Sequence, residues 1–232
     1  MSDPIGIVAP VVARLGPVAV TTTVVYSLLD SAVLVVGSAL ITHAVTLRMT
    51  PGQNVLELVV EWILDQIKAV TGAKDPKAFL PLIATLGLFI LVGNVMGILP
   101  GLAAPTSDLS TTAALALVVF FAVPYYGIRD RGVAGYLRHY LEPTWVMLPF
   151  NVISEVARTL ALAVRLFGNM MSGELVTAVL ILIAGLLVPV PILALHLLIA
   201  LVQAYIFAVL SLVYIGAVLR RRPESQEPKE AP

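Results

Sequence analysis

Residues 146–188 form one long, mostly apolar stretch, and its length limits how the chain can fold. A helix of about 43 residues would be about 64 Å long, whereas the hydrocarbon core of a bilayer is about 30 Å thick. Such a helix cannot stand upright, so it must tilt strongly, lie nearly in the membrane plane, or break. Residues 189–191, Pro-Val-Pro, predict a sharp turn before a second long apolar segment at 192–219. The pattern favours a long, strongly tilted helical hairpin.

The composition places the whole chain in a membrane. Of the 232 residues, 59% are hydrophobic and only 12% are charged, which is typical of a polytopic membrane protein. The chain has no cysteine, and its three histidines lack an HExxH-like spacing, so we expect no metal site. No phosphate-binding glycine motif is present either. We therefore expect no cofactor, no nucleic-acid partner and no catalytic residue.

We predict an all-α polytopic membrane protein with five membrane segments in a single membrane domain, residues 1–222. A segment of mixed apolar and acidic character at 54–70 has helical periodicity, and is expected to be an interfacial amphipathic helix. The tail 223–232 is rich in proline and glutamate and is expected to be disordered and cytoplasmic. The predicted spans are about 18–46, 79–99, 109–127, 146–188 and 192–219.

The basic residues predict the orientation of the chain. Lysine and arginine gather in loops that five spans would place on one side, and none occurs in the loops at 100–108 and 188–191. Because cytoplasmic loops carry the excess of basic residues, the C-terminus is expected in the cytoplasm and the N-terminus outside. The residues are Arg48, Lys68, Lys74, Lys77, Arg129, Arg131, Arg138, Arg220, Arg221 and Arg222.

Arg165 lies within the fourth predicted span, with apolar segments on both sides. A charged side chain at membrane depth costs about 3 kcal/mol on insertion scales, and about 10–17 kcal/mol in simulations of an isolated helix. Such a residue usually faces a water path, a counter-ion or a partner subunit. No acidic residue stands three or four positions away from Arg165. Its counter-charge is therefore expected from another helix or another chain.

Other polar residues of the fourth span fall on the same side of the helix as Arg165. At about 100° per residue, they lie within about 100° of one another and leave the remaining faces apolar. Glu155 and Arg158 are three apart and could pair. The alternative for the lone amides and the serine is that they join helices by hydrogen bonds. The residues of this stripe are Asn151, Glu155, Arg158, Arg165, Asn169 and Ser172.

Glu174 lies about 140° from Asn169 on the helical wheel, so it is expected to face a different neighbour. In the fifth span His196, Gln203 and Tyr214 nearly eclipse one another. The turn at 189–191 would bring His196 to a depth similar to that of Glu174, and Gln203 toward the level of Arg165. For Tyr214 the alternative is simple packing.

Asp30, in the first predicted span, stays open at this point. It could be a functional carboxylate, a contact to a partner, or a lipid-facing residue beyond the true end of the span.

The run Arg165-Leu166-Phe167-Gly168-Asn169, followed by Gly173-Glu174 and by His196 and Gln203, resembles the a subunit of rotary F-type ATP synthases. Weaker similarities extend over most of the chain. They are 89–100, which ends GNVMGILP, the loop Pro-Thr-Ser-Asp-Leu at 105–109, and Pro-Phe-Asn at 149–151. Arg158 departs from the lysine that many relatives carry, but preserves the charge.

The resemblance implies a non-catalytic stator subunit in a bacterial plasma membrane, facing a ring of c subunits and joined by b-type peripheral stalk subunits. Two offset half-channels would reach the ring from opposite sides, with Arg165 between them. Glu174 and His196 would belong to the outer half-channel, and Asn169 and Gln203 would be polar neighbours of the arginine. Asn151, Glu155 and Arg158 are candidates for the cytoplasmic half-channel, and Ser172, Tyr214 and Asp108 for additional polar lining.

Three other readings remain. The coupling ion could be Na⁺, although a glutamate–histidine pair favours protons because both groups can exchange them around neutral pH. A stand-alone transporter would predict inverted repeats and paired broken helices, and the sequence has neither. A purely structural membrane anchor would predict no unpaired charge within a span, which Arg165 contradicts.

Overall fold

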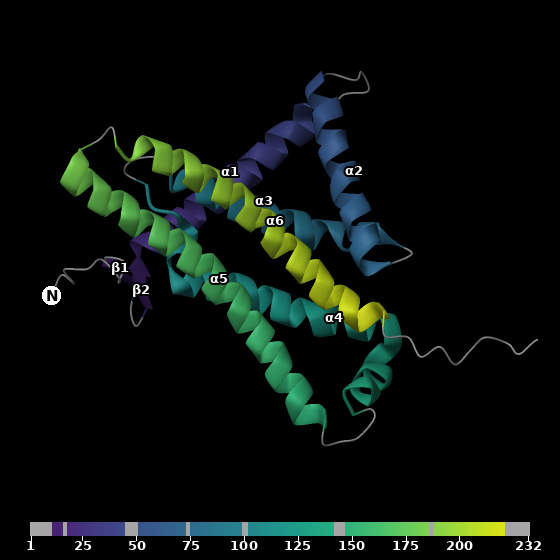
Figure 1. The fold of residues 1–232 in the computed structure, drawn as a ribbon. Helices are drawn as coiled ribbons and strands as arrows, with labels where there is room; N and C mark the ends of the chain where they lie inside the picture. The colour runs from purple at the N-terminus through teal and green to yellow at the C-terminus, as the bar shows by residue number, and fades with distance from the viewer. Residues whose placement is uncertain are drawn as a thin grey trace, which may run out of the picture.

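The computed structural model describes residues 11–15, 18–44, 51–72, 75–98, 102–141, 147–185 and 188–220. The helices are α1 (Thr22–Ala44), α2 (Pro51–Thr71), α3 (Leu80–Met96), α4 (Leu109–Leu141), α5 (Met147–Ala184) and α6 (Val190–Arg220), shown in Figure 1. Two 3₁₀ turns, η1 (Pro76–Ala78) and η2 (Pro105–Ser107), precede α3 and α4. Helices α1, α4, α5 and α6 are long and apolar enough to cross a membrane, and α3 is a shorter apolar helix. The predicted all-α polytopic class is confirmed.

The N-terminal part of the first predicted span is not helical. Residues 18–21 form strand β2 (Val18–Thr21), which pairs antiparallel with β1 (Val11–Leu15). Valine and threonine, which are β-branched, make up three of the four residues of β2 and favour an extended backbone. The helix therefore starts at Thr22, and the chain carries a small hairpin in front of an otherwise helical fold.

Other predicted boundaries shift for identifiable reasons. The stretch of α4 that could cross a membrane, Leu109–Asp130, agrees with the third predicted span, about 109–127, but the helix itself continues to Leu141 with a kink at Gly132 (φ 74°). Helix α5 ends at Ala184, where Gly185 adopts φ 75° and donates its N–H to Ile181. Residues 97–98, in the second predicted span, form a turn after α3. Helix α2 begins earlier than predicted, at Pro51, a residue that is favoured in the first turn of a helix. Residues 45–46, 99, 146, 186–187 and 223–232 of the predicted segments lie outside the described residues.

Helices α5 and α6 form the expected hairpin. They lie side by side near their connecting turn and spread apart toward their other ends, where α4 packs against both (Figure 1). Helix α5 has 38 residues and stays helical throughout, so at 1.5 Å per residue it is about 57 Å long. A helix of that length must tilt strongly to fit a bilayer.

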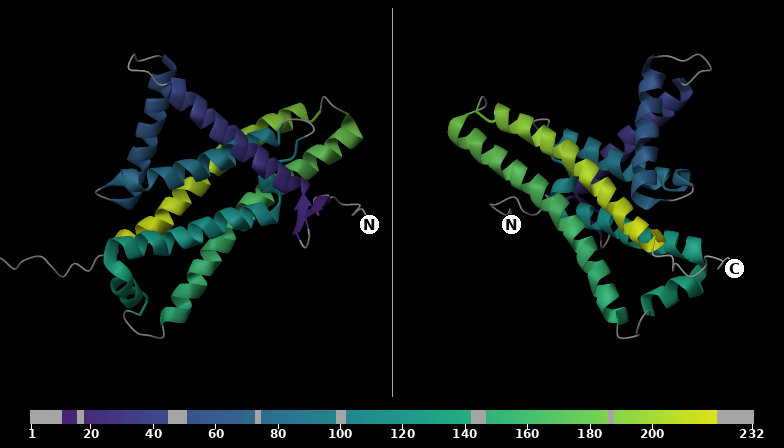
Figure 2. Two further views of the ribbon diagram at one scale, coloured as in Figure 1. Left: turned by 180° about the vertical axis from the view of Figure 1, so that it is seen from behind. Right: turned by 45° about the vertical axis from the view of Figure 1, so that its right-hand side comes forward.

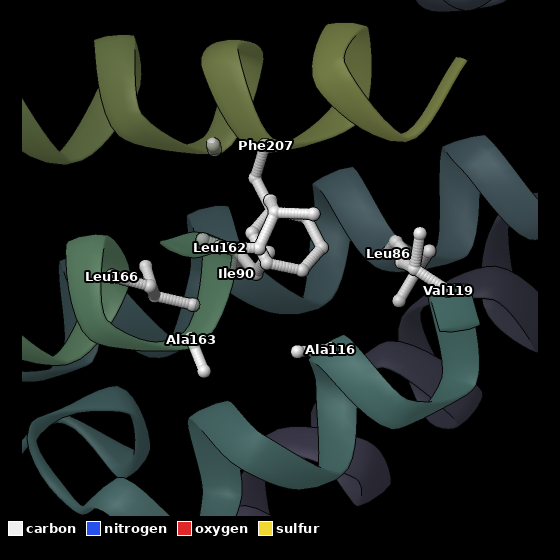
Figure 3. Packing of buried hydrophobic residues seen from close by; sticks show 9 residues of the cluster. Leu86, Ile90, Ala116, Val119, Leu162, Ala163, Leu166 and Phe207 are labelled. Atoms are coloured by element: carbon white, nitrogen blue, oxygen red, sulfur yellow. The ribbon is translucent and has the colours of Figure 1, made fainter. Parts of the chain in front are cut away.

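The core joins four helices at the middle of the bundle. Side chains from α3, α4, α5 and α6 meet around Phe207, as Figure 3 shows. Buried alanines at the contacts let the backbones approach closely, which is the usual basis of helix packing in membranes. The cluster comprises Leu86, Ile90, Ala116, Val119, Leu162, Ala163, Leu166, Ala204 and Phe207.

A second cluster anchors α2 to the bundle. Ile67 of α2 is fully buried among residues of α3, α4 and α6. Trp62 stacks on Tyr205 of α6 with ring centroids 5.6 Å apart, while Leu58 on α2 stays exposed. One face of α2 therefore packs on protein and another remains apolar and uncovered by the described chain. Its location at the membrane interface stays a prediction.

Phe207→Ala should destabilise the bundle by about 3–5 kcal/mol, because it removes the side chain around which four helices pack and leaves a cavity. The midpoint of thermal unfolding in detergent measures this loss. Leu40→Ala, at a position on α1 that is 65% exposed, is the matched control and should leave the midpoint nearly unchanged. Equal shifts for both variants would contradict the core as described.

Candidate functional site

Arg165 projects from the outer surface of the bundle. Leu162 and Leu166 on either side of it are buried in the four-helix core and fix the rotation of α5. Arg165 itself is exposed, and no hydrogen bond or ion pair joins its guanidinium to another residue in the described ranges. The packing of its neighbours thus holds an unpaired charge on the surface of a membrane helix. This agrees with the expectation that its counter-charge comes from elsewhere.

Asn169 and Gln203 link α5 to α6 next to this arginine. The Asn169 side-chain N–H donates to the Gln203 side-chain oxygen at 3.2 Å, and Gln203 is buried. Ser172, one turn further on, donates its hydroxyl to the carbonyl oxygen of Asn169 at 3.0 Å. The expectation that the hairpin brings Gln203 to this level is confirmed. This link also satisfies the alternative reading, in which such amides hold helices together.

Glu174 faces the segment that precedes α4, on a different side of α5 from Asn169. Its carboxylate accepts the backbone N–H of Ala104 at 2.9 Å, just before η2, while the Ser107 hydroxyl donates to the carbonyl oxygen of Ala104 at 2.8 Å. Sequence reasoning missed this contact, because the donor is a backbone N–H, which every residue type except proline carries. The only feature of the sequence that marks this segment is the run Pro-Thr-Ser-Asp-Leu that follows Ala104.

His196 lies against Gly173, the residue before Glu174. A Cβ atom on Gly173 would overlap the His196 ring near Nε2, so the imidazole occupies the space that a side chain would fill. The opposite ring nitrogen, Nδ1, lies 3.1 Å from the carbonyl oxygen of Ile192. Within the described chain no hydrogen bond joins Glu174 to His196 directly. The hairpin nevertheless places both groups at one level of α5.

A small cavity lies between α4, α5 and α6 on the other side of Arg165. It measures about 40 Å³, enough for water, and its lining includes Glu155, Arg158, Thr159 and Tyr214. The Arg158 guanidinium donates to the carbonyl and hydroxyl oxygens of Ser154 and lies 5.6 Å from the centre of the Tyr214 ring. A cation over an aromatic face is stabilising, so Tyr214 helps to hold Arg158 at the cavity wall.

Two predicted residues take other positions. Asn151 lies one turn before Glu155 on α5 and is not part of the cavity lining. Asp108 accepts the backbone N–H of Ser110 at 2.9 Å and so caps the start of α4. The capping contact gives Asp108 a structural role, and its role in lining a path stays a prediction.

These features define a class of protein. A membrane bundle presents one unpaired guanidinium on its surface, with polar groups reaching it along the same helix from both directions. Such an arrangement suits a subunit that conducts an ion along its interface with another chain. The charge requires a partner, and the described residues do not supply one.

Comparison with known proteins identifies the family. The model for the ATP synthase A chain matches residues 20–216. ATP synthase subunit a 2 of Picosynechococcus is 49% identical over 211 residues, covering 90% of each chain. ATP synthase subunit a of Albidiferax ferrireducens is 52% identical over 200 residues, covering 85% of this chain and 86% of its own. ATP synthase subunit a 1 of Hahella chejuensis is 48% identical over 220 residues, covering 95% and 93%.

The chain belongs to the ATP synthase A chain family, as the run around Arg165 indicated. It is a multi-pass membrane subunit of the F-type ATP synthase, and a non-catalytic one, since ATP chemistry takes place on the F1 part of the complex.

Gly173→Ala should slow ion transport by the assembled complex, because the added methyl group must displace the His196 ring. We expect ATP-driven ion uptake into vesicles to fall several-fold while the amount of assembled complex stays unchanged. Gly37→Ala is the matched control, since a Cβ at Gly37 would meet no other atom within 4 Å. Normal transport by the Gly173 variant would show that the His196 position is unimportant.

Proposed function

We propose that this subunit forms two offset ion half-channels against the c-ring and thereby couples ion flow to rotation. The observation that carries this proposal is Arg165, which is held rigidly by buried neighbours yet exposed and unpaired within the described chain. The carboxylate of a ring subunit is the partner that suits such a charge. The membrane and the c-ring follow from the family, and contact with b-type stalk subunits is part of the proposal.

The guanidinium suits the task because arginine keeps its charge even in apolar surroundings. As a ring carboxyl group approaches, this positive charge favours the ionised form and releases its proton. The same charge repels ions that would otherwise cross directly from one half-channel to the other. Each ion must therefore travel around with the ring, driven by about 2.3 kcal/mol per charge per 100 mV of membrane potential.

The spacing along α5 supports two separate paths. Glu174 follows Arg165 by nine residues and Glu155 precedes it by ten, so the two carboxylates lie about 14 Å and about 15 Å from it along the axis. With the C-terminus in the cytoplasm, the α5–α6 turn and Glu174 are at the outer side. Glu174 and His196 then belong to the outer half-channel, and Asn169 and Gln203 lie between them and Arg165.

The cavity beside Arg158 supports the cytoplasmic half-channel. It lies at the end of the bundle near the C-terminus of α6, and Glu155 gives it an acidic group. Arg158 and Tyr214 form its wall, so an ion leaving the ring would pass a hydrated space before reaching the cytoplasm. Asn151, one turn beyond, would lie on the way out.

We propose the proton as the coupling ion. Glu174 and His196 lie at one level of the hairpin, and carboxyl and imidazole groups are side chains that carry protons. The ring contributes to this choice, so the transport experiments below include sodium.

Arg165→Ala should abolish coupled transport without preventing assembly, because the guanidinium makes no hydrogen bond or ion pair with a described residue of its own chain. The measurement is ATP-driven acidification of vesicles that contain the complete complex, with and without sodium. Val164→Ala, at the neighbouring exposed position, is the control and should pump normally. Normal pumping by the Arg165 variant would refute the mechanism, and sodium uptake without acidification in the wild type would change the ion.

Glu174→Gln and His196→Ala should each slow passage through the outer half-channel by about tenfold or more, since positioned acid–base groups typically contribute at least that much to proton transfer. The rate of ATP synthesis driven by an imposed potential reports uptake from the outer side. Unchanged rates over the whole range of outer pH would reduce both residues to packing roles.

A further inference from the structure

The first half of helix α1 turns polar side chains inward and apolar side chains outward. Of the α1 residues whose exposure is described, 22–43, only Thr23 and Asp30 are buried, and they lie seven residues apart on one face. Ser27 lies between them, half-buried, and donates its hydroxyl to the carbonyl oxygen of Thr23. Figure 2 shows α1 crossing α3 obliquely, and this first half of α1, next to the β-hairpin, is the part that lies against the bundle. A helix that only anchored the chain in lipid would need no such polar inner face.

Asp30 is completely buried at the junction of α1, α3 and η2. A Cβ on Gly93 would lie 3.2 Å from Asp30 Oδ2 and 3.5 Å from the ring of Pro105, so the carboxyl group fills the space that Gly93 leaves open. Asn94 and Thr106, which follow Gly93 and Pro105 in the sequence, are also buried and are joined by a hydrogen bond from the threonine hydroxyl to the asparagine oxygen.

Three buried polar atoms in this region have no hydrogen-bond partner among the described residues. They are both carboxyl oxygens of Asp30 and the side-chain nitrogen of Asn94. Buried polar groups in proteins almost always have a partner, so a group of three that lacks one requires an explanation. An exchanging proton and the water that carries it would satisfy all three.

No positive charge balances Asp30 from the helices packed against it. Helix α3 and η2 contain no lysine, arginine or histidine, and the first basic residue of α4 is Arg129, at its far end. The titratable groups closest to the junction in sequence are Tyr26 on α1 itself and Asp108 directly after η2, and Glu174 accepts the N–H of Ala104 before η2. An unpaired carboxylate in such a place is costly, and a bound proton removes that cost.

We propose that Asp30 is a second proton-exchanging carboxyl group of the outer half-channel. Both it and Glu174 lie next to the segment 104–107, where Glu174 accepts the N–H of Ala104 and Asp30 lies beside Pro105. The Asp30 acid releases its proton to water that passes it to the Glu174 carboxylate, and the Asp30 carboxylate regains a proton from outer water. The charge on Asp30 is thus only transient. This role rests on the proposed outer half-channel.

The test compares Asp30→Asn, Glu174→Gln and the double variant in the complete complex. The complexes are reconstituted in phosphatidylcholine liposomes, and a fixed potassium–valinomycin potential drives ATP synthesis at graded outer pH. Asp30→Asn keeps the size of the side chain but cannot exchange a proton. Its rate should fall about tenfold or more, and most at high outer pH, where proton capture limits the rate. Because both acids act in one path, the double variant should be no slower than the slower single variant.

Infrared difference spectroscopy detects protonation of Asp30 directly, and this signal would not change if Asp30 had only a structural role. The carboxylic-acid C=O band of a protonated Asp30 should be present in the wild type and absent from Asp30→Asn. Wild-type rates for Asp30→Asn at every outer pH, or no loss of that band, would overturn the proposal. Should Asp30→Asn fail to assemble, Asp30→Glu replaces it. That variant should conduct with a shifted dependence on outer pH, and an unshifted dependence would count against Asp30.

The two proposals fail in different ways. Slow synthesis in Glu174→Gln with normal synthesis in Asp30→Asn would leave the outer half-channel standing and remove Asp30 from it. The reverse result would keep Asp30 as a proton-exchanging group and remove Glu174 from the path.

Discussion

The unpaired charge of Arg165 is the constraint on which the rest of the structure depends. A guanidinium on the surface of a membrane helix is costly unless another molecule meets it, and the described chain supplies no partner. The fold keeps it there by rigid means, since Leu162 and Leu166 are locked into the four-helix core on either side. The bundle thus holds α5 at a fixed rotation while leaving the charged end of the arginine free for a partner chain.

The other polar groups make sense by their position relative to this arginine. The link between Asn169 and Gln203 ties α6 to α5 at its level, and so fixes the hairpin where the charge is presented. Farther along α5, Gly173 lets the His196 ring approach, and Glu174 binds the segment before α4. In the other direction Arg158 and Tyr214 bound a cavity that can hold water. A single long helix therefore organises both proposed paths, which explains why α5 is longer than any simple span requires.

Sequence reasoning predicted the parts that depend on length, periodicity and charge. Apolar runs located the long helices, the predicted hairpin brought Gln203 toward the level of Arg165, and helical spacing turned Glu174 away from Asn169. It could not predict contacts made by the backbone, such as that of the Ala104 N–H with Glu174. Nor could it predict close packing against a glycine, such as that of the His196 ring on Gly173. The burial of Asp30 was equally hidden, because a wheel separates polar from apolar faces without showing which one points inward. Valine-rich residues 18–21 read as membrane helix because hydrophobicity alone does not distinguish a strand from a helix.

Cysteine cross-linking would test the central claim most directly, because the chain contains no cysteine of its own. Single cysteines at Ala161, Gly168 and Ser172, all exposed on α5 near Arg165, would be oxidised against a matching cysteine beside the ring carboxylate. A cysteine at Val35, exposed on α1, serves as the control. We predict that all three α5 positions capture the c subunit and that Val35 does not. Capture from Val35 alone, or from no position in an assembled complex, would show that Arg165 does not face the ring.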